Sequence, residues 1–430
     1  MEKDVGIELF LVQCPGVGGR LKKYPEDFVV EEELDISEWE GDGDYVIAKV
    51  WSRNWETNRL IRQLSRELRI SRRKIRFAGT KDKRAVTTQW MSFHVDPQEL
   101  ERVNIRDVEI SNMTRSSKSL YIGAHKGNRF DIAVRDLDVD TEEARVISDK
   151  VGSCIRELGG FPNWFGVQRF GTIRPVTHLV GKAMVRGDFE EAVKLYIANP
   201  MEGEEKESYD ARKKLEETWD YGAALKEFPH ILTFERAIIQ ELVKDPEDHV
   251  SALNVLPDNL LTMFVHAYQS YLFNNILCER LKRGLPLKDV VPGDIVLPVD
   301  REGYPVLDRA VSIQDRNLDR GSDMVKQGKG YVSAPLFGID TEFAEGEPGE
   351  IEREIIEEEG LTGSDFIIPE IRKLSSRGSR RSIFSPVQDL DWEVSQGGLR
   401  LRFILQKGSY ATCLLREFMK LPDEAVERYS

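Results

Sequence analysis

The segment KIRFAGTKDKRAVTTQWMSFHV (74–95) joins two runs that are typical of β-strands to a short, strongly charged loop. Residues 74–80 and 85–95 are rich in β-branched and aromatic side chains, so they predict a strand, a tight loop and a second strand. The tetrapeptide KDKR (81–84) falls on that loop. The rest of the fold can be built outward from this pair of strands.

Asp82 lies on the loop among Lys81, Lys83 and Arg84. Neighbouring cations stabilise an ionised carboxylate, the form that a nucleophile or a base requires. The same cations suit the phosphates that flank a nucleotide, and this placement leaves the carboxylate facing the sugar and base. For a bare KDK tripeptide, however, a polar hairpin turn with one aspartate is the simpler interpretation, so the functional one needs support from elsewhere in the chain.

Strand and helix patterns alternate on both sides of the loop. Apolar side chains in TNRLIRQLSREL (57–68) recur at helical spacing with arginines between them. A capping box at Asp140 predicts a helix that ends at Gly159. The absence of long parallel βαβ units indicates an α+β arrangement. Further strands are predicted at 27–34, 45–52 and 128–137.

The pattern changes after about residue 165. Helical patterns dominate 176–285, and residues 286–340 are rich in Pro and Gly with a short strand candidate at 293–299. A half-buried strand returns at 399–408, followed by a helix for which Ser409 or Thr412 is the expected cap. A β-rich beginning and end around a different middle predict one domain interrupted by an insertion.

Charge is segregated along the chain. The 430 residues carry 61 Lys and Arg against 75 Asp and Glu, a net charge of −14. Residues 51–84 nevertheless hold twelve basic and three acidic side chains (+9), whereas 340–370 hold twelve acidic and one basic (−11). Residues 371–381 follow at +5. Such segregation gives an acidic protein one positive face, which suits nucleic acid.

Several classes of function are not expected. The 40% apolar content supports folded cores, and no apolar run approaches the roughly 18 residues that span a bilayer. The first 20 residues lack a signal-peptide pattern, so a cytoplasmic protein without a membrane is expected. The four cysteines are far apart and form no CxxC pair, and the chain contains no P-loop, HExxH or GxSxG motif. We therefore expect neither metal nor nucleotide cofactor.

AGTKDKRAVTTQ (78–89) resembles the signature of the TruD family of tRNA pseudouridine synthases, and five more segments match the family in the same order. Six blocks span nearly the whole chain, which is identified as an archaeal or eukaryotic-like member. Trp164 and Thr80 stand where other members often carry other residues, but neither departure affects the aspartate. The other matching segments are LKKYPEDFVVEE (21–32), GNRF (127–130), FPNWFGVQRFG (161–171), AYQSYLFN (267–274) and GSYATCLLREF (408–418).

The resemblance implies roles for individual residues. Asp82 would be the catalytic carboxylate, with Lys22 as the partner that holds it. Phe130 would stack on the extruded uracil, with plain core packing as the alternative. Asn128, two residues earlier on the same strand face, would hydrogen-bond Asp82 or the target nucleotide. The remaining expected substrate-binding or cleft-supporting residues are Gln89, Arg169, Lys81, Lys83 and Arg84, with Arg169 alternatively contacting phosphate.

The implied fold is the α+β pseudouridine synthase fold, which has a mainly antiparallel mixed sheet and a central cleft. The catalytic domain would comprise residues 1–160 and 385–430, and a family-specific α/β insertion domain would comprise 161–384. The basic stretch 51–84 would line the cleft.

The implied function is isomerisation of uridine to pseudouridine in transfer RNA, in many members at position 13. Asp82 would act as the nucleophile, without cofactor or metal; whether it attacks C1′ or the base, or instead abstracts a sugar proton, is not determined by the sequence. A non-catalytic RNA-binding protein or chaperone is the alternative, although it would not need Asp82. A nucleoside hydrolase would usually need a second carboxylate. The sequence does not determine the oligomeric state, and a monomer is one of the options.

Overall fold

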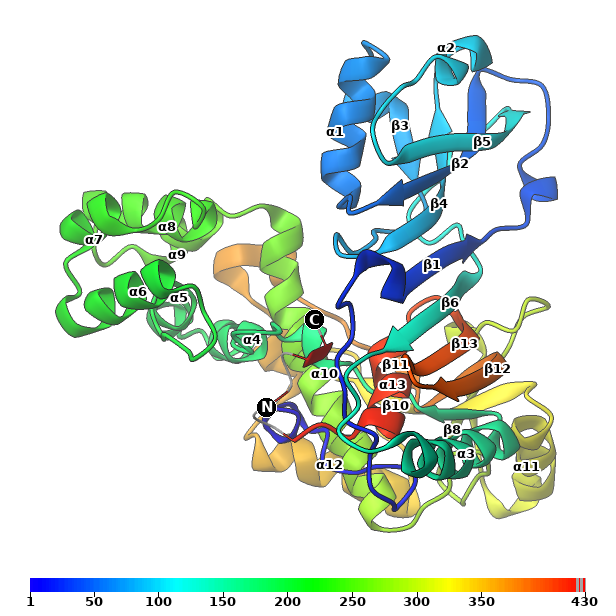
Figure 1. The fold of residues 1–430 in the computed structure, drawn as a ribbon. Coiled ribbons are helices and arrows are strands. Elements are labelled where there is room, and N and C mark those ends of the chain that lie inside the picture. Colours follow the sequence, from blue (N-terminus) through cyan, green and yellow to red (C-terminus); the bar gives the residue numbers. More distant parts are fainter. Residues whose placement is uncertain (423–424, 426–427, 430) are drawn as a thin grey trace. The chain divides into compact units, whose positions relative to one another are not determined.

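The loop-flanking strands belong to one large mixed sheet. The computed structural model describes residues 1–422, 425, 428 and 429, and it divides into two compact units, one of residues 10–161 with 385–430 and one of residues 1–9 with 162–384. The sheet lies in the first unit, in the strand order β5-β2-β4-β1-β6-β13-β12-β7, with β3 paired to β4 (Figure 1). Its strands are β1 (Phe28–Glu33), β2 (Tyr45–Arg53), β3 (Ile75–Phe77), β4 (Val86–Phe93), β5 (Val108–Ser116), β6 (Gly127–Val134), β7 (Gly160–Pro162), β12 (Phe384–Ser395) and β13 (Gly398–Gln406).

The strand directions confirm a mainly antiparallel mixed sheet. β1 runs parallel to β4, whereas its other neighbour β6 is antiparallel to it. The pairs β2–β4, β2–β5, β3–β4, β6–β13 and β12–β13 are also antiparallel. The predicted strands at 27–34, 45–52, 74–80, 85–95, 128–137 and 399–408 are therefore present, and β5 is a strand that the sequence patterns did not single out.

Helices of this unit begin and end where local chemistry predicts. The carboxylate of Glu56 accepts hydrogen bonds from the first amides of α1 (Thr57–Glu67), whose buried leucines and isoleucine pack on one face of the sheet. Asp140 caps α3 (Thr141–Leu158), which ends at Gly159 with a left-handed φ of 80°. The expected caps of α13 (Ala411–Met419) were wrong, because the N-cap residue is Tyr410. The remaining helix is α2 (Pro97–Glu101).

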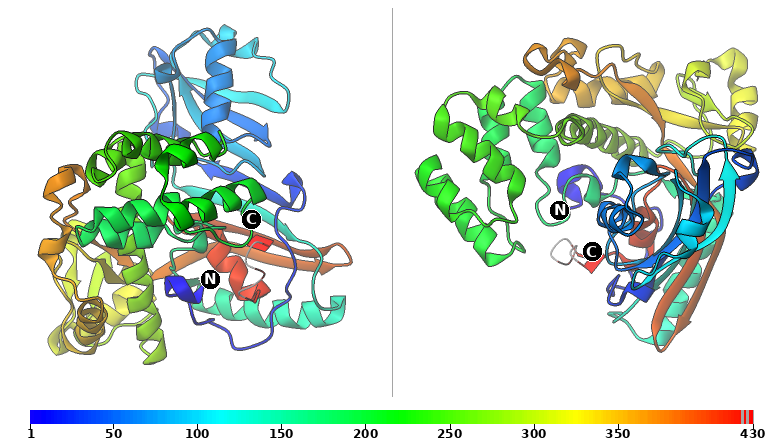
Figure 2. Two further views of the ribbon diagram at one scale, coloured as in Figure 1. Left: turned by 90° about the vertical axis from the view of Figure 1, so that its left-hand side faces the viewer. Right: turned by 90° about the horizontal axis from the view of Figure 1, so that it is seen from above.

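The second unit combines a helical group with a small sheet. Its four strands follow the antiparallel order β11-β10-β8-β9, and α4–α9 pack against one another (Figure 2). No helix in the described part of the chain is both long and apolar enough to cross a membrane. The elements are α4 (Thr177–Val185), α5 (Phe189–Ile197), α6 (Lys206–Thr218), α7 (Tyr221–Glu227), α8 (Thr233–Lys244), α9 (His249–Asn254), α10 (Asp258–Lys282), β8 (Ile295–Pro298), β9 (Val311–Ser312), α11 (Leu318–Lys326), β10 (Gly330–Leu336), α12 (Gly346–Glu358) and β11 (Ser379–Ser382).

The division into a catalytic and an insertion domain concerns function and stays a prediction. The two compact units meet along the chain at 161/162 and 384/385. Residues 1–9, which we expected to accompany the large sheet, belong to the unit of 162–384. There the side-chain amide of Asn274 donates a hydrogen bond to the carbonyl of Val5.

Candidate active site

Asp82 and Lys22, 60 residues apart in sequence, form an ion pair on the loop between β3 and β4. Nζ of Lys22 lies 2.8 Å from Oδ2 of Asp82. The Lys22 side chain is only 11% exposed and its ammonium lies 4.6 Å from the ring centroid of Phe28, whereas the Asp82 side chain is 64% exposed. The protein thus fixes the cation and presents the carboxylate to solvent, an arrangement that suits a nucleophile or base acting on a bound ligand.

Lys81 does not share this exposure. Its ammonium forms an ion pair with Glu32 of β1, and the two side chains are 7% and 0% exposed. The backbone amide of Lys81 also donates to Oγ1 of Thr57, at 2.8 Å, which ties the loop to the first turn of α1. Lys81 therefore has an alternative role to the expected contact with substrate: its side chain anchors the loop beneath Asp82.

Glu32 is a site residue that the sequence patterns did not reveal. Its second carboxylate oxygen accepts a hydrogen bond from the backbone amide of Trp90, at 2.8 Å. Burial raises the pKa of this carboxyl, and the ammonium of Lys81 opposes that shift. The available signal was the alternation of β1, in which residues 28, 30 and 32 face inward.

The loop approaches its support closely at Gly79. A Cβ atom there would lie 3.1 Å from Cε1 of His125 and 3.3 Å from Oε1 of Glu32, tighter than nearly all real Cβ contacts. His125 is itself buried. Desolvation, followed by the charges of Lys81 and Lys407, lowers its pKa to about 4. A neutral imidazole can therefore pack beside the Lys81 ammonium without adding a second positive charge.

Strand register brings Gln89, Glu32 and Asn128 onto one face of the sheet. Glu32 pairs directly with Asn128 on β6. On the other side, Glu31 pairs with Thr88 of β4, which places Gln89 beside Glu32. Among the described residues, the buried oxygens Oε1 of Gln89 and Oδ1 of Asn128 have no hydrogen-bond partner. Both side chains therefore retain unused hydrogen-bonding capacity next to the loop anchor.

Phe130 lies on the same face but is only 8% exposed. Its ring stacks on Phe403 of β13, with centroids 5.2 Å apart, and meets the edge of Phe28 at 6.3 Å. Because the ring of Phe28 also lies under the Lys22 ammonium, these three rings form an aromatic cluster beneath the Lys22–Asp82 pair. This burial strengthens the core-packing alternative for Phe130, while the cluster supplies an apolar surface next to the ion pair.

The other expected substrate contacts fall in different places. Lys83 and Arg84 are exposed on the loop with Asp82. The Arg84 guanidinium donates to the Lys23 carbonyl, at 3.1 Å. Arg169 belongs to the unit of 162–384, where its guanidinium donates to the Ser270 hydroxyl, at 3.2 Å. Within the described part of the chain, no group of three or more His, Cys, Asp or Glu side chains could hold a metal ion.

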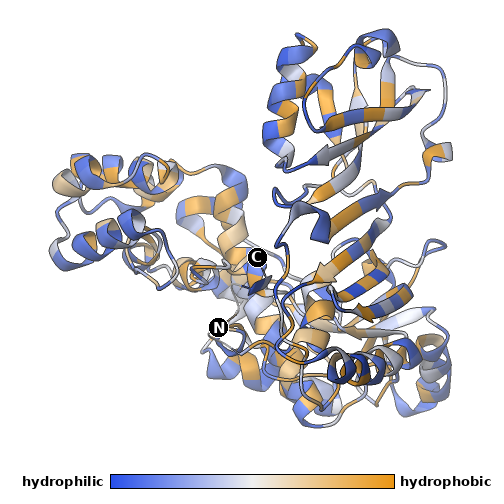
Figure 3. Cartoon of the chain, in the orientation of Figure 1, coloured by the Kyte–Doolittle hydropathy of each residue, from blue (hydrophilic) through white to orange (hydrophobic). Residues whose placement is uncertain are grey.

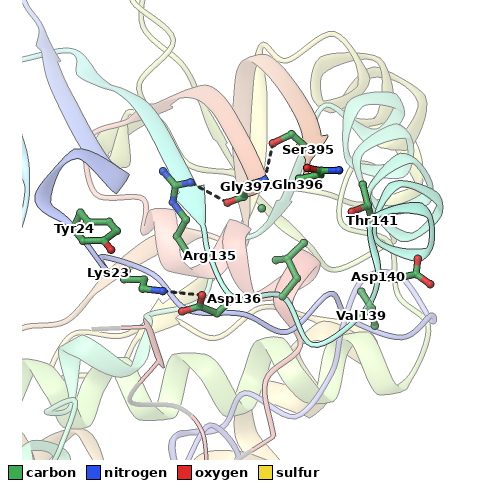
Figure 4. A pocket seen from close by; sticks show the side chains of 12 residues that line it. Lys23, Tyr24, Arg135, Asp136, Val139, Asp140, Thr141, Ser395, Gln396 and Gly397 are labelled. Carbon is green, nitrogen blue, oxygen red and sulfur yellow. Dashed lines mark hydrogen bonds and ion pairs between the residues drawn. The ribbon is translucent and has the colours of Figure 1, made fainter.

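A pocket of about 560 Å³ is lined by Lys23, Tyr24, the start of α3 and the β12–β13 turn (Figure 4). Its cations are already engaged within the protein. Lys23 lies 2.8 Å from Asp136, and the guanidinium of Arg135 donates to the Gly397 carbonyl, at 2.9 Å. The pocket therefore shows no free positive charge for a phosphate, and we assign it no ligand.

The model of the family described as tRNA pseudouridine synthase D (TruD) matches residues 4–418. A relative from Methanococcoides burtonii, named probable tRNA pseudouridine synthase D, is 44% identical over 428 residues, which are 98% of this chain and 97% of the relative. One of the same name from Pyrococcus furiosus is 38% identical over 421 residues, 98% of this chain and 100% of the relative. The crystal structure of the putative tRNA pseudouridine synthase D from Methanosarcina mazei superimposes with a TM-score of 0.85, at 42% identity and 97% coverage of both chains.

Proposed function

This chain belongs to the TruD family of tRNA pseudouridine synthases, and we propose that it converts a uridine of transfer RNA to pseudouridine at the loop that carries Asp82. The observation that carries this proposal is the exposed carboxylate of Asp82, held by the nearly buried ammonium of Lys22 above an aromatic cluster. We further propose that the unit containing the large sheet is the catalytic domain, and that residues 162–384 form the insertion domain.

The reaction is an isomerisation, so uridine and pseudouridine contain the same atoms and no co-reactant is needed. The glycosidic bond between C1′ and N1 breaks, the uracil turns, C5 bonds to C1′, and the proton on C5 leaves as N1 gains one. Asp82 acts as the nucleophile in this proposal: its carboxylate forms a transient bond to the nucleoside, and that bond breaks again as C5 bonds to C1′. Its exposure leaves room for a nucleotide, and Lys22 fixes its orientation from the protein side.

The surroundings of Asp82 suit an extruded uridine. The rings of Phe28, Phe130 and Phe403 offer an apolar surface that replaces part of the stacking lost on base flipping. The unpartnered amide oxygens of Gln89 and Asn128 match the N–H donor of uracil. Lys83 and Arg84, exposed on the same loop, face the flanking phosphates. We take position 13 of a cytoplasmic tRNA as the target.

Tritium release from 5-[³H]uridine-labelled tRNA tests the reaction. Release with the base retained in the RNA indicates isomerisation, free uracil indicates hydrolysis, and neither indicates a binding protein. The identity of the modified nucleotide is read by mapping pseudouridine along the tRNA.

Asp82→Asn tests the role of the carboxylate, because asparagine keeps the shape and removes the charge. We expect no tritium release, unchanged thermal melting, and tRNA affinity that is unchanged or slightly higher, since one repulsive partner of the phosphates is gone. Asp42→Asn is the matched control, because it makes the same change at another exposed aspartate of the same unit, and it should still release tritium. Appreciable turnover by Asp82→Asn would refute the assignment.

A further inference from the structure

The outer side of α1 and the turn that follows it carry a row of cations, which we call the basic ridge: Arg59, Arg62, Arg66, Arg69, Arg72 and Arg73. All six side chains are exposed. Among the described residues, none of the six forms an ion pair with an acidic side chain. The guanidinium of Arg59 lies 5.2 Å from the ring centroid of Trp55. The hydrophilic residues of α1 appear in blue in Figure 3.

The absence of partners on the basic ridge differs from charged helices elsewhere in the chain. On α5, Lys194 pairs with Glu190 one turn away, at 2.5 Å. Arg283, the C-cap residue of α10, pairs with Glu279 in the same way, at 3.0 Å. Such pairs support a helix, whereas like charges at the same spacing destabilise it.

Like charges occupy this spacing on α1. Arg59 and Arg62 are three residues apart, and Arg62 and Arg66 are four apart, so they are neighbours on the helix surface. The residues of α1 other than arginine that lie one turn from Arg62 or Arg66 are Asn58, Gln63 and Ser65, none of them acidic. Arg59 lies three residues after Glu56, whose carboxylate is engaged in capping the helix. Repulsion between these exposed guanidinium groups therefore lowers the stability of the helix.

The basic ridge begins at the candidate active site and extends away from it. The first residue of α1, Thr57, accepts the hydrogen bond from the amide of Lys81, next to Asp82 in sequence. At about 1.5 Å of rise per residue, Arg66 lies roughly 14 Å further along the helix. The far part of the ridge, from Arg66 onward, is thus too distant from Asp82 to touch the reacting nucleotide, while its near end at Arg59 is continuous with the loop that would hold it.

We propose that the basic ridge binds the phosphate backbone of the tRNA on one side of the target uridine. This inference rests on the proposed function, which supplies the polyanion, and it assigns a surface that the reaction itself does not need. Guanidinium groups bind phosphate oxygens with paired N–H donors. Contacts to the backbone carry no sequence information, so the ridge contributes affinity rather than the choice of uridine.

The salt dependence of tRNA binding tests the proposal. We compare wild-type protein with the triple variant Arg62→Gln, Arg66→Gln, Arg69→Gln by measuring the dissociation constant between 50 and 200 mM salt. Each lost phosphate contact lowers the log–log slope by about 0.7–0.9. The slope should therefore become shallower by about 2–3, and binding at low salt should weaken at least tenfold.

A matched control removes the same charge from the other unit. Arg309, Arg316 and Arg320 are also exposed, and no ion pair to them is recorded among the described residues. The control triple variant Arg309→Gln, Arg316→Gln, Arg320→Gln should keep the wild-type slope. The ridge variant should melt at or above the wild-type temperature, because repulsion along α1 is relieved.

A second ridge variant, Arg62→Lys, Arg66→Lys, Arg69→Lys, keeps the charge and should keep the slope. The proposal is overturned if the glutamine ridge variant binds tRNA with the wild-type slope and affinity, or if the control variant loses as much. The two proposals can fail independently. If the proposed function is wrong, the wild-type protein releases no tritium, whereas the salt dependence of tRNA binding still shows whether the ridge binds RNA.

Discussion

Replacing Lys81 with methionine should destabilise the sheet-containing unit by about 3–5 kcal/mol, the usual cost of leaving a buried charge without its partner. Methionine fills the space of the lysine stem, so the change removes the ammonium and leaves the packing. The Glu32 carboxylate, which is fully buried, then loses its ion pair and keeps only the amide of Trp90. Asp82 is the next residue in the loop, so single-turnover pseudouridine formation should fall as well.

The double variant Lys81→Met, Glu32→Gln separates anchoring from substrate binding. Glutamine still accepts from the Trp90 amide but carries no charge, so the pair of changes should recover at least half of the lost free energy of unfolding. We would measure all four corners of this cycle by urea denaturation, with tRNA affinity in parallel. If Lys81→Met unfolds like the wild type but binds tRNA weakly, Lys81 contacts substrate and the anchoring argument is wrong.

The pH dependence of the single variant gives a second check. Burial raises the pKa of Glu32 above its unfolded value, and removing Lys81 removes the charge that opposes this shift. A group with a raised pKa supports the folded state below its unfolded pKa, about 4.3, and loses that support as the pH rises through the folded value. The stability deficit of Lys81→Met should therefore shrink between pH 7 and pH 5. A deficit that stays constant over this range would contradict the buried-charge explanation.

Three further predictions concern neighbours of the loop. Gly79→Ala should cost about 1–3 kcal/mol and slow tritium release, because the new Cβ would lie 3.1 Å from His125; wild-type melting and turnover would show that the loop can move aside. The pKa of His125 is lowered from 6.5 to about 4, so the unfolded state binds a proton at a higher pH than the folded state does. The free energy of unfolding should therefore fall by up to about 3 kcal/mol as the pH drops from 6.5 to 4. Urea denaturation of His125→Gln should lack that part of the acid sensitivity, and a pH profile identical to that of the wild type would refute it. Phe130→Leu should lower the free energy of unfolding by about 1–3 kcal/mol, because it removes the ring contacts with Phe28 and Phe403. It should also release tritium about 5- to 150-fold more slowly, as expected for one lost stack of about 1–3 kcal/mol; unchanged turnover would leave Phe130 a core residue only.

Local patterns in the sequence determined much of the fold and the position of the loop. Runs rich in β-branched and aromatic residues identified β1, β2 and β4, and the alternation of side chains identified β6 and β13. Helical spacing of apolar residues identified α1, and the acidic cap Asp140 identified the start of α3. The order of six short segments identified the family, which the comparison over residues 4–418 confirms.

The surroundings of Asp82 were decided by tertiary structure. Alternation along β1 puts Glu32 on the side of Phe28 and Val30, opposite Glu31 and Glu33, but only the pairing of β1 with β4 and β6 buries it and turns Lys81 inward. Phe403 meets Phe130 across 273 positions because β13 pairs with β6. Such contacts depend on strand register between distant segments, which no local period encodes, whereas the exposed row of arginines on α1 depends only on the helix and could be read from the sequence.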